Sequence, residues 1–428
     1  MIRSSRRRRS AHSEYWMRRT KRKKTNGASS TATVAVDFFC GAGGMTSGLI
    51  KAGLHVLAGV DNEPLCEKTY RQSKNRDGSR PGFICKDIFP RTKAHPRGQQ
   101  EDIRLAISRL LSGFRKRSGI RRPRLVFAIC APCQPFTKIT KIKISEGRQF
   151  KRDNDSNLLL TTVGLIRHFK PDAIICENVE GLVNDDPNGV ISSFKRRLTR
   201  AGYVFDAKIV NASNFGVPQN RRRTIGLAFL KKRYGSDLEV AEKDPNLRAP
   251  RTVADTIGYL PPLAAGEADP SIPNHRARAL SALNLKRIAC AVPGESNLAL
   301  RDTPYGDLSL RCHQELERRA GAQSFADTYT RMRGDGVAPT ITTKCMSITN
   351  GRFGHYDRRQ NRAITPREAA LLQTFPKRYV FYPEDSIDFA STLIGNAVPP
   401  RLARFFGRFV IRRIATETSR SERRLTVR

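Results

Sequence analysis

Short apolar runs and amphipathic helical patterns alternate along the first half of the chain. The runs that predict strands are residues 34–39, 55–60, 83–84, 125–129, 173–176, 203–210 and 224–230. Helical spacing extends to residue 50 and covers residues 63–72, 103–114, 158–168 and 190–198. Strands that alternate with helices in this way pair in parallel, with helices on both faces. The pattern therefore predicts an α/β fold with a doubly wound parallel sheet, and ligands at the carboxyl ends of its strands.

The regular alternation ends near residue 230. From about residue 231 to 340, prolines such as Pro261, Pro262 and Pro293 interrupt every pattern, which predicts a second, irregular domain. A last helix over residues 400–414 has an apolar face that should pack back onto the sheet, and the charged tail after it should fray. The predicted units are a basic arm (1–32), the sheet domain (33–230), the irregular domain (231–350), a return segment with the last helix (351–416) and a basic tail (417–428).

Charge narrows the class of partner. Among 428 residues, 78 Lys and Arg face 39 Asp and Glu, a formal net charge of +39. This excess argues against a secreted hydrolase or a membrane transporter and favours nucleic acid, unless the protein is merely overcharged. The first 24 residues hold eleven Lys and Arg, one acid (Glu14) and no apolar stretch. They predict a disordered cationic arm rather than a targeting peptide, although a misassigned translation start would look the same.

Membrane spans and bound metals are not expected. No apolar run approaches the ~18 residues that a transmembrane helix needs. Nine cysteines without a regular framework predict free thiols in a reducing cytoplasm. Cys130 and Cys133 form a C-x-x-C, but no second pair or histidine cluster completes a zinc site.

The first predicted strand runs into a glycine-rich turn that opens a helix, at residues 41–44. Backbone amides of such a turn can approach a ligand closely. Glu63 follows the second strand and Asp87 the third, where carboxylates suit ribose hydroxyls and an adenine amino group. Together these features favour a nucleoside cofactor, unless Glu63 only caps a helix and Asp87 a turn. Thr46 replaces the third glycine of the dinucleotide pattern, which disfavours NAD.

Candidate catalytic residues follow the next strands. Cys133 comes after Pro132, whose ring stiffens the loop, and a thiol near cations or a helix start can act as a nucleophile. Glu177 ends the neighbouring strand, and a partly buried glutamate can donate a proton to a substrate. Arg221 and Arg223 should share one face of the last strand and can hold a carbonyl or a phosphate. The alternatives are an inert buried thiol, a capping acid and a solvated arginine run.

In this order, the motifs resemble those of the DNA cytosine-5 methyltransferases. The matching elements are Asp37–Gly44, Asn62-Glu63, Asp87, Pro132-Cys133-Gln134, Glu177-Asn178-Val179, Gln219-x-Arg221-x-Arg223 and Gly395-Asn396-Ala397-Val398-Pro399-Pro400. The resemblance covers roughly residues 33 to 413. It implies a Rossmann-like, S-adenosylmethionine-dependent methyltransferase fold, with a smaller target-recognition domain at residues 231–350. Ala131 stands where family members often have proline, which implies a slightly looser loop.

The resemblance also implies a role for each matched residue. Cys133 would attack carbon 6 of cytosine, and Glu177 would protonate the ring nitrogen N3. Arg223, supported by Arg221, would hold the base carbonyl. The residues implied in binding S-adenosylmethionine are Phe39 against the adenine, Gly41, Gly43, Gly44, Glu63 at the ribose, Asp87 at the adenine edge, Ile88, Pro132, and Asn396 and Val398 at the methionine end. No metal is implied.

The implied partner is double-stranded DNA, from which the target cytosine must be flipped before a thiolate can reach its ring. The basic stretch 137–153 is expected to close over it, and the irregular domain to read the sequence. The chain is expected to be a cytoplasmic monomer, and a cognate restriction endonuclease encoded nearby would fit this family. Two alternatives remain: a tRNA cytosine-5 methyltransferase and a catalytically inactive DNA-binding homologue.

Overall fold

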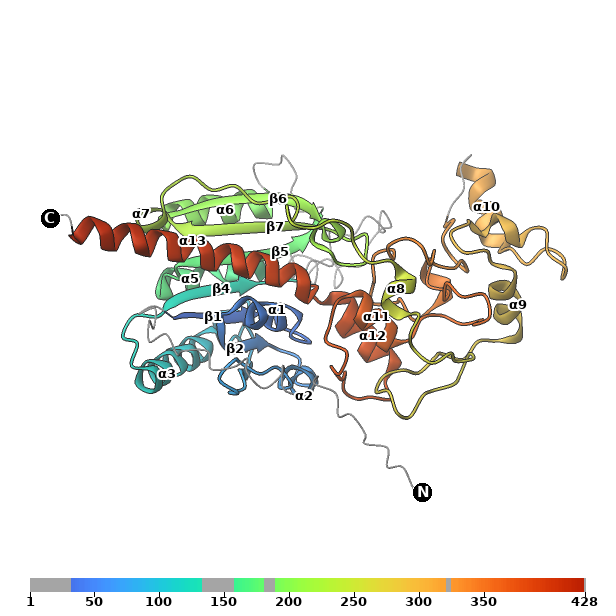
Figure 1. The fold of residues 1–428 in the computed structure, drawn as a ribbon, viewed down its shortest axis with the longest axis horizontal. Helices are drawn as coiled ribbons and strands as arrows, with labels where there is room; N and C mark the ends of the chain where they lie inside the picture. The colour runs from blue at the N-terminus through green and yellow to red at the C-terminus, as the bar shows by residue number, and fades with distance from the viewer. Residues whose placement is uncertain (1–31, 133–157, 181–188, 321–324, 427–428) are drawn as a thin grey trace, which may run out of the picture.

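A seven-stranded sheet forms the centre of the first half of the protein. The computed structural model describes residues 32–132, 158–180, 189–320 and 325–426 (Figure 1). Within these residues the strand order is β3-β2-β1-β4-β5-β7-β6. The strands are β1 Thr33–Phe38, β2 His55–Asp61, β3 Gly82–Cys85, β4 Arg124–Ile129, β5 Ala173–Val179, β6 Tyr203–Asn211 and β7 Arg222–Leu230. Every strand predicted from the sequence is present.

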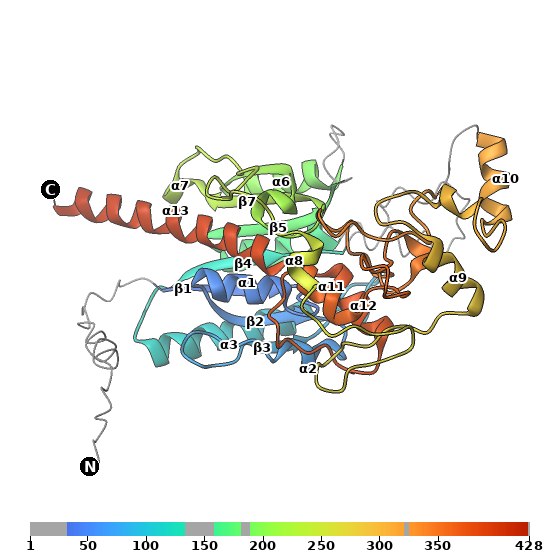
Figure 2. The same ribbon diagram turned by 45° about the vertical axis from the view of Figure 1, so that its right-hand side comes forward.

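Helices cover both faces of the sheet (Figure 2). Two of them, α1 and α13, pack on one face, and α3, α5 and α6 pack on the other. Their bounds are α1 Gly44–Ala52, α3 Gln100–Ser118, α5 Val163–Phe169, α6 Val190–Arg200 and α13 Pro400–Thr426. In β1, Val34 and Phe38 pack with α3, α5 and α6, and Ala35 packs with α1 and α13, as strand alternation requires. The doubly wound α/β arrangement is confirmed.

One strand runs against the others. β7 is antiparallel to both of its neighbours, β5 and β6, whereas the other paired strands are parallel. The prediction of a fully parallel sheet was wrong at this position. The link from β6 to β7 contains only a short 3₁₀ turn, Ala212–Phe215, and no crossover helix. Parallel neighbours need a crossover of about a dozen residues or more, so the shorter link gives an antiparallel pair.

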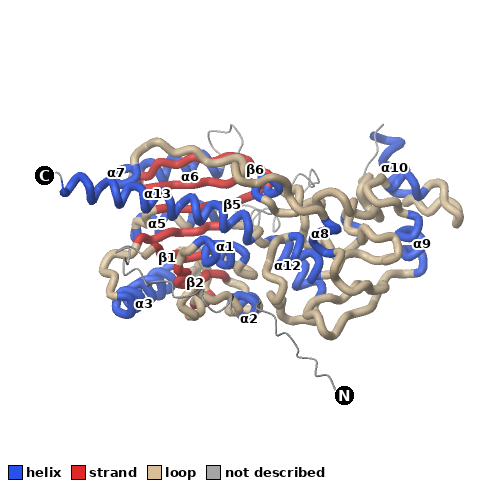
Figure 3. Tube along the Cα trace, in the orientation of Figure 1, coloured by secondary structure: helices blue, strands red, loops and turns tan. Residues whose placement is uncertain are grey.

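The chain after β7 is mostly loop (Figure 3). Its α-helices before α13 are α7 Lys231–Tyr234, α8 Val253–Ile257, α9 Ala282–Cys290, α10 Arg311–Ala320, α11 Pro366–Leu372 and α12 Ile387–Asn396. One apolar cluster joins α8, α11 and α12 to the turn after β1 and to α2 (Cys66–Tyr70). A smaller cluster around Ile288, Leu300 and Tyr329 forms a separate core in the outlying part that carries α9 and α10 (Figure 1).

Buried arginines hold this irregular region together. Arg331, Arg362 and Arg367 are each at most 1% exposed. Arg331 donates to the main-chain carbonyls of Ile288, His355, Asp357 and Gln360. Arg362 donates to the carbonyl of Leu263 and pairs with Glu368, at 2.7 and 2.8 Å from its two carboxylate oxygens. Main-chain carbonyls in loops have no partner in a strand ladder. Each arginine guanidinium has five N–H donors, which can form hydrogen bonds with these carbonyls.

The last helix closes the sheet domain from the far end of the sequence. α13 lies along α1, and Leu402, Phe406 and Val410 join the apolar core beneath it, so the predicted packing is confirmed. The predicted fraying after residue 416 was wrong, because the helix continues to Thr426. Glutamate and arginine are good helix formers, and no glycine or proline interrupts this stretch. None of the described helices is both long and apolar enough to span a membrane.

Candidate active site at the carboxyl ends of the strands

The turn after β1 has a backbone that favours glycine. Gly41 and Gly43 have φ of +45° and +77°, and Phe39 also has a positive φ, 59°. The amide of Gly41 donates to Asp61 Oδ2 at 2.8 Å, which ties the turn to the end of β2. A Cβ atom added to Gly41 would meet nothing within 4 Å. This side of the turn therefore has room for a ligand.

The other side of the turn is closed by the C-terminal segment. A Cβ atom added to Gly44 would lie 2.3 Å from the Val398 carbonyl oxygen, so only glycine fits there. The Tyr379 hydroxyl donates to the carbonyl of Ala42 at 2.6 Å. Val398 is buried, and Asn396 is exposed at the end of α12. The structure thus brings the final motif against the glycine turn, although the two lie far apart in sequence.

Asp37, which the sequence analysis did not assign as a site residue, lies beneath the turn. It is fully buried and accepts hydrogen bonds from the Thr46 amide at 3.0 Å and the Thr46 hydroxyl at 2.7 Å. Burial raises the pKa of Asp37 to about 7, although the hydrogen bonds from Thr46 oppose the rise. An acid inside an apolar strand, followed by a threonine in the first turn of the helix, was the available signal. Asp37 fixes where α1 begins.

The two predicted ribose and adenine ligands lie at neighbouring strand ends. Glu63 is exposed, and its Oε1 accepts from the Leu65 amide at 3.1 Å. Asp87 Oδ1 accepts from the Phe89 amide at 3.0 Å. The Asp87 contact matches the turn-capping alternative, but α2 has no side-chain cap, so the Glu63 contact lies in the turn before that helix. Each contact uses one oxygen of a carboxylate that has two. Ile88 is buried in the core beside Asp87, and Phe39 is half-buried at the edge of the same core.

A carboxylate and a guanidinium meet at the end of β5. Val179 of β5 pairs in register with Arg223 of β7, which places Arg223 beside Glu177. Arg223 Nε lies 3.2 Å from Glu177 Oε1, and the two side chains are 16% and 9% exposed. Burial lowers the pKa of Arg223, and the negative charge of Glu177 opposes this. The predicted acid and the predicted base-holding arginine therefore form one shielded pair.

The loop that leads to the predicted nucleophile is tied to the same strand end. Asn178 Nδ2 donates to the carbonyl of Ala131 at 3.2 Å. Pro132 is exposed and is the last described residue before a gap. Cys133 and the predicted closing loop, 137–153, lie outside the described residues. Asn178 belonged to the Glu-Asn-Val motif, but its partner is a main-chain atom 47 residues away, which no side-chain pattern reveals.

Arg221 connects three distant segments. It is 2% exposed and donates to the carbonyls of Ile341 at 2.8 Å and Gly395 at 2.9 Å. Burial lowers its pKa, and the nearby charge of Arg223 adds to the effect. Gln219 Oε1 accepts from the Ile341 amide at 2.9 Å, which strengthens the same junction. The Arg221 guanidinium is therefore engaged with the main chain, and it anchors the final motif near the glycine turn.

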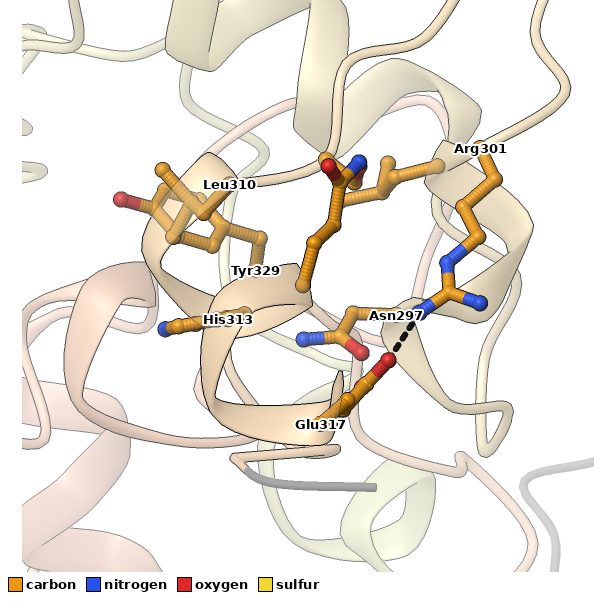
Figure 4. A pocket seen from close by; sticks show the side chains of 9 residues that line it. Asn297, Arg301, Leu310, His313, Glu317 and Tyr329 are labelled. Atoms are coloured by element: carbon orange, nitrogen blue, oxygen red, sulfur yellow. Dashed lines mark hydrogen bonds and ion pairs between the residues drawn. The ribbon is translucent and has the colours of Figure 1, made fainter. Parts of the chain in front are cut away.

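A hollow also lies in the outlying part of the irregular region. Figure 4 shows Asn297, His313 and Tyr329 around it, with Arg301 ion-paired to Glu317 on α10. Its volume is about 10 Å³, which is about the space of one water molecule. The hollow reflects local packing. In the described ranges, no group of three or more His, Cys, Asp or Glu side chains is placed to hold a metal ion.

Comparison with known proteins assigns the family. Residues 34–412 match the sequence model of the C-5 cytosine-specific DNA methylases. The chain belongs to this family. A Type II methylase, M.HgiDII of Herpetosiphon aurantiacus, is 36% identical over 387 residues, which cover 88% of this chain and 94% of the relative. Type II methyltransferase M1.HphI of Haemophilus parahaemolyticus is 30% identical, with 88% and 86% covered.

Solved structures share the fold of this cytosine-specific methylase. A prophage-encoded E. coli protein assigned as a DNA modification methyltransferase has a TM-score of 0.61 at 19% identity, and the match covers 90% of this chain and 100% of that one. A DNMT2 structure from Spodoptera frugiperda has a TM-score of 0.52 at 15% identity, with 88% and 98% covered. The Rossmann-like methyltransferase fold is confirmed. Family membership makes the chain a DNA methyltransferase and implies S-adenosylmethionine as the methyl donor.

Proposed function

We propose that this methylase modifies carbon 5 of a cytosine that is flipped out of a specific sequence in double-stranded DNA, through a covalent adduct with Cys133. The observation that carries the proposal is the shielded Glu177–Arg223 pair at the end of β5, next to the loop that leads to Cys133. A proton donor held beside a nucleophile is what addition to an aromatic ring requires.

The proposed chemistry divides between the two residues. The Cys133 thiolate adds to carbon 6 while Glu177 gives its proton to N3, and carbon 5 becomes nucleophilic. S-adenosylmethionine would supply the methyl group that bonds to carbon 5, with cleavage of its sulfur–methyl bond and S-adenosylhomocysteine as the leaving group. A solvent base then takes the proton from carbon 5, the bond between Cys133 and carbon 6 breaks, and Glu177 recovers its proton from N3. Ring and enzyme are both restored.

The two arginines have different roles in this proposal. Arg223 orients the Glu177 carboxyl and supplies a donor to the base carbonyl, because its side chain already lies beside the acid. Arg221 is a positioning residue. It fixes the ends of the segments at Ile341 and Gly395, and so sets where β7 and the final motif meet.

The residues around the glycine turn fit an adenosyl methyl donor. The open side of Gly41 leaves room for it, and the carboxylates of Glu63 and Asp87 follow β2 and β3 at the same sheet edge. The side chains and amides proposed to hold it are Phe39, Gly41, Gly43, Gly44, Glu63, Asp87, Ile88, Pro132, Asn396 and Val398. The Gly41 amide is itself held in place by Asp61.

Recognition of DNA is proposed for residues 231–350, with the return segment 351–416 completing the sheet domain. The basic arm, residues 1–32, would add phosphate contacts that carry no sequence information. Trimming the arm is therefore expected to weaken non-specific binding and flatten its salt dependence, with the same cytosine methylated. The protein would act as a cytoplasmic monomer, and type II relatives make a cognate restriction endonuclease the natural partner gene.

One assay tests the proposal against its alternatives. Purified protein receives labelled S-adenosylmethionine with either duplex DNA or tRNA. We expect label in duplex DNA, and none with Cys133→Ser, while Cys312→Ser, a change at an exposed cysteine on α10, transfers like the parent. Label only in tRNA would overturn the substrate, label in neither would favour an inactive homologue, and an active Cys133→Ser protein would overturn the adduct.

A further inference from the structure

A cationic pocket lies on the side of the glycine turn that Tyr379 closes. Its volume is about 340 Å³, within the range of small-ligand sites. α1, the segment that follows α2, and the loop before α12 form its walls. The polar lining residues include Ser47 and Lys51 of α1, Ser73 and Lys74 after α2, and Arg378 and Tyr379 of the loop.

The charged side chains that line this pocket are all positive. Lys51, Lys74 and Arg378 line it, and no aspartate or glutamate is among its lining residues in the described structure. Burial lowers the pKa of Lys51, and the charge of Arg404 on α13 lowers it further. Three cations that face a common space without a carboxylate repel each other, and an anion between them would relieve that repulsion.

A buried hydroxyl points to the same conclusion. Ser73 is 7% exposed, and its Oγ faces the Tyr379 hydroxyl without the geometry of a full hydrogen bond. The Tyr379 hydroxyl beside it already donates to the carbonyl of Ala42. A buried hydroxyl without a full hydrogen bond costs free energy, which an acceptor oxygen in the pocket would recover.

We propose that this pocket binds a phosphate group, held by Lys51, Lys74 and Arg378, with the Ser73 hydroxyl as an additional donor. Phosphate oxygens can accept hydrogen bonds from all of these donors, and none of the residues that line the pocket is among those proposed to hold the methyl donor. Two sources share this chemistry: a backbone phosphate of bound DNA and a free phosphate compound.

The first experiment measures binding of inorganic pyrophosphate to the full-length protein by isothermal titration calorimetry at fixed ionic strength. Lys74→Gln/Arg378→Gln should weaken binding at least about tenfold, and Ser73→Ala about threefold, with melting temperatures near that of the parent. The control is Arg121→Gln/Arg122→Gln, which removes two exposed charges before β4 and should change binding less than about twofold. S-adenosylhomocysteine should not displace the pyrophosphate.

An equal loss in the control pair, or no saturable binding by the parent, would overturn the site. Displacement by S-adenosylhomocysteine would also overturn it, because the ligand would then occupy the methyl-donor site. The affinity for duplex DNA, measured over a range of salt concentrations, distinguishes the two sources of the phosphate group. If a DNA phosphate occupies the pocket, Lys74→Gln/Arg378→Gln lowers the salt slope by about one. If a free compound does, the slope stays at the parent value while the pyrophosphate loss remains.

Discussion

The sheet domain and the irregular region are held together by different interactions. In the sheet, Val36, Val126 and Phe127 are fully buried, and strand ladders pair the main chain. In the irregular region, the largest fully buried side chains include Arg331 and Arg362, which pair carbonyls that no ladder reaches. Burial of apolar side chains stabilises the sheet domain, whereas hydrogen bonds from charged side chains contribute much of the stability of the irregular region.

Because of this difference, the net charge of the chain overstates the positive charge that its surface can offer to a nucleic acid. A formal charge of +39 suggests a surface prepared for a polyanion. Several of the arginines that contribute to it are nevertheless interior and bind the protein's own carbonyls or, for Arg362, the Glu368 carboxylate. Charge in the irregular region is therefore partly structural, whereas the candidate catalytic charges lie at strand ends that apolar packing supports.

The largest effect is expected from a change at the sheet edge. Glu177→Gln removes the proton donor but keeps an acceptor for Arg223, so the rate constant of methyl transfer should fall about 100- to 10,000-fold. Stability should change little. The measurement is single-turnover methyl transfer, alongside urea unfolding. Glu180→Gln is the control, because Glu180 lies three residues on and pairs with exposed Arg222. Equal losses of activity in the two variants would remove Glu177 from the chemistry.

The next effect tests the irregular region. Arg362→Met should destabilise the fold by about 3–5 kcal/mol, because it leaves the buried Glu368 carboxylate unpaired. Burial alone would raise the pKa of Glu368, but hydrogen bonds from Arg362 and His355 hold it well below its ordinary value. Urea unfolding measures the loss. Arg359→Met removes an exposed ion pair and should leave the free energy of unfolding close to that of the parent. If the two variants lose similar amounts of free energy of unfolding, buried arginines do not stabilise this region more than exposed ones.

Asp37 should make the stability of the sheet domain depend on pH. Its pKa is about 7 in the folded protein against an ordinary 3.8, so the folded state binds more protons in that window. The free energy of unfolding should therefore fall as pH rises from about 4 to 7, by roughly 3–4 kcal/mol from this group. Asp37→Asn should remove that contribution. The measured quantity is the stability difference between variant and parent, and a difference that is constant with pH would contradict the assignment.

The smallest effect concerns the contact between the two ends of the chain. Gly44→Ala places a methyl group against the Val398 carbonyl and should cost about 1–3 kcal/mol, with weaker binding of S-adenosylmethionine. Gly82→Ala is the control, since its added Cβ atom would have no neighbour closer than 3.6 Å. Thermal unfolding and equilibrium dialysis report the two effects. A Gly44→Ala protein that matches the control would show that this junction tolerates displacement.

Local patterns were sufficient for the elements of the sheet. The short apolar runs of β1 and β4 and the apolar spacing of α3 each indicate burial within a few residues, and all three elements are present. The order of motifs also identified the family, because their residues share one sheet edge. The direction of β7 was predicted wrongly, since it depends on the geometry of a link and not on strand composition.

The features that the sequence did not predict depend on contacts between residues far apart in the chain. A sequence pattern treats an arginine run as a solvated face or a ligand site, and nothing local shows that Arg221 meets the carbonyls of Ile341 and Gly395. Asp37 was overlooked for the opposite reason, because an acid within an apolar strand has no obvious partner until the helix that carries Thr46 is placed. Interior polar contacts depend on the assembled fold.

The packing of α13 on α1 also has a consequence for the order of synthesis. The ribosome makes α1 among the first elements and α13 last, yet these helices cover the same face of the sheet. The part of that face under α13 stays uncovered, and the Val398 carbonyl does not reach Gly44, until nearly the whole chain has left the ribosome. A nascent or prematurely terminated chain therefore lacks a closed glycine turn, so only a protein that already contains its entire irregular region can complete this end of the site.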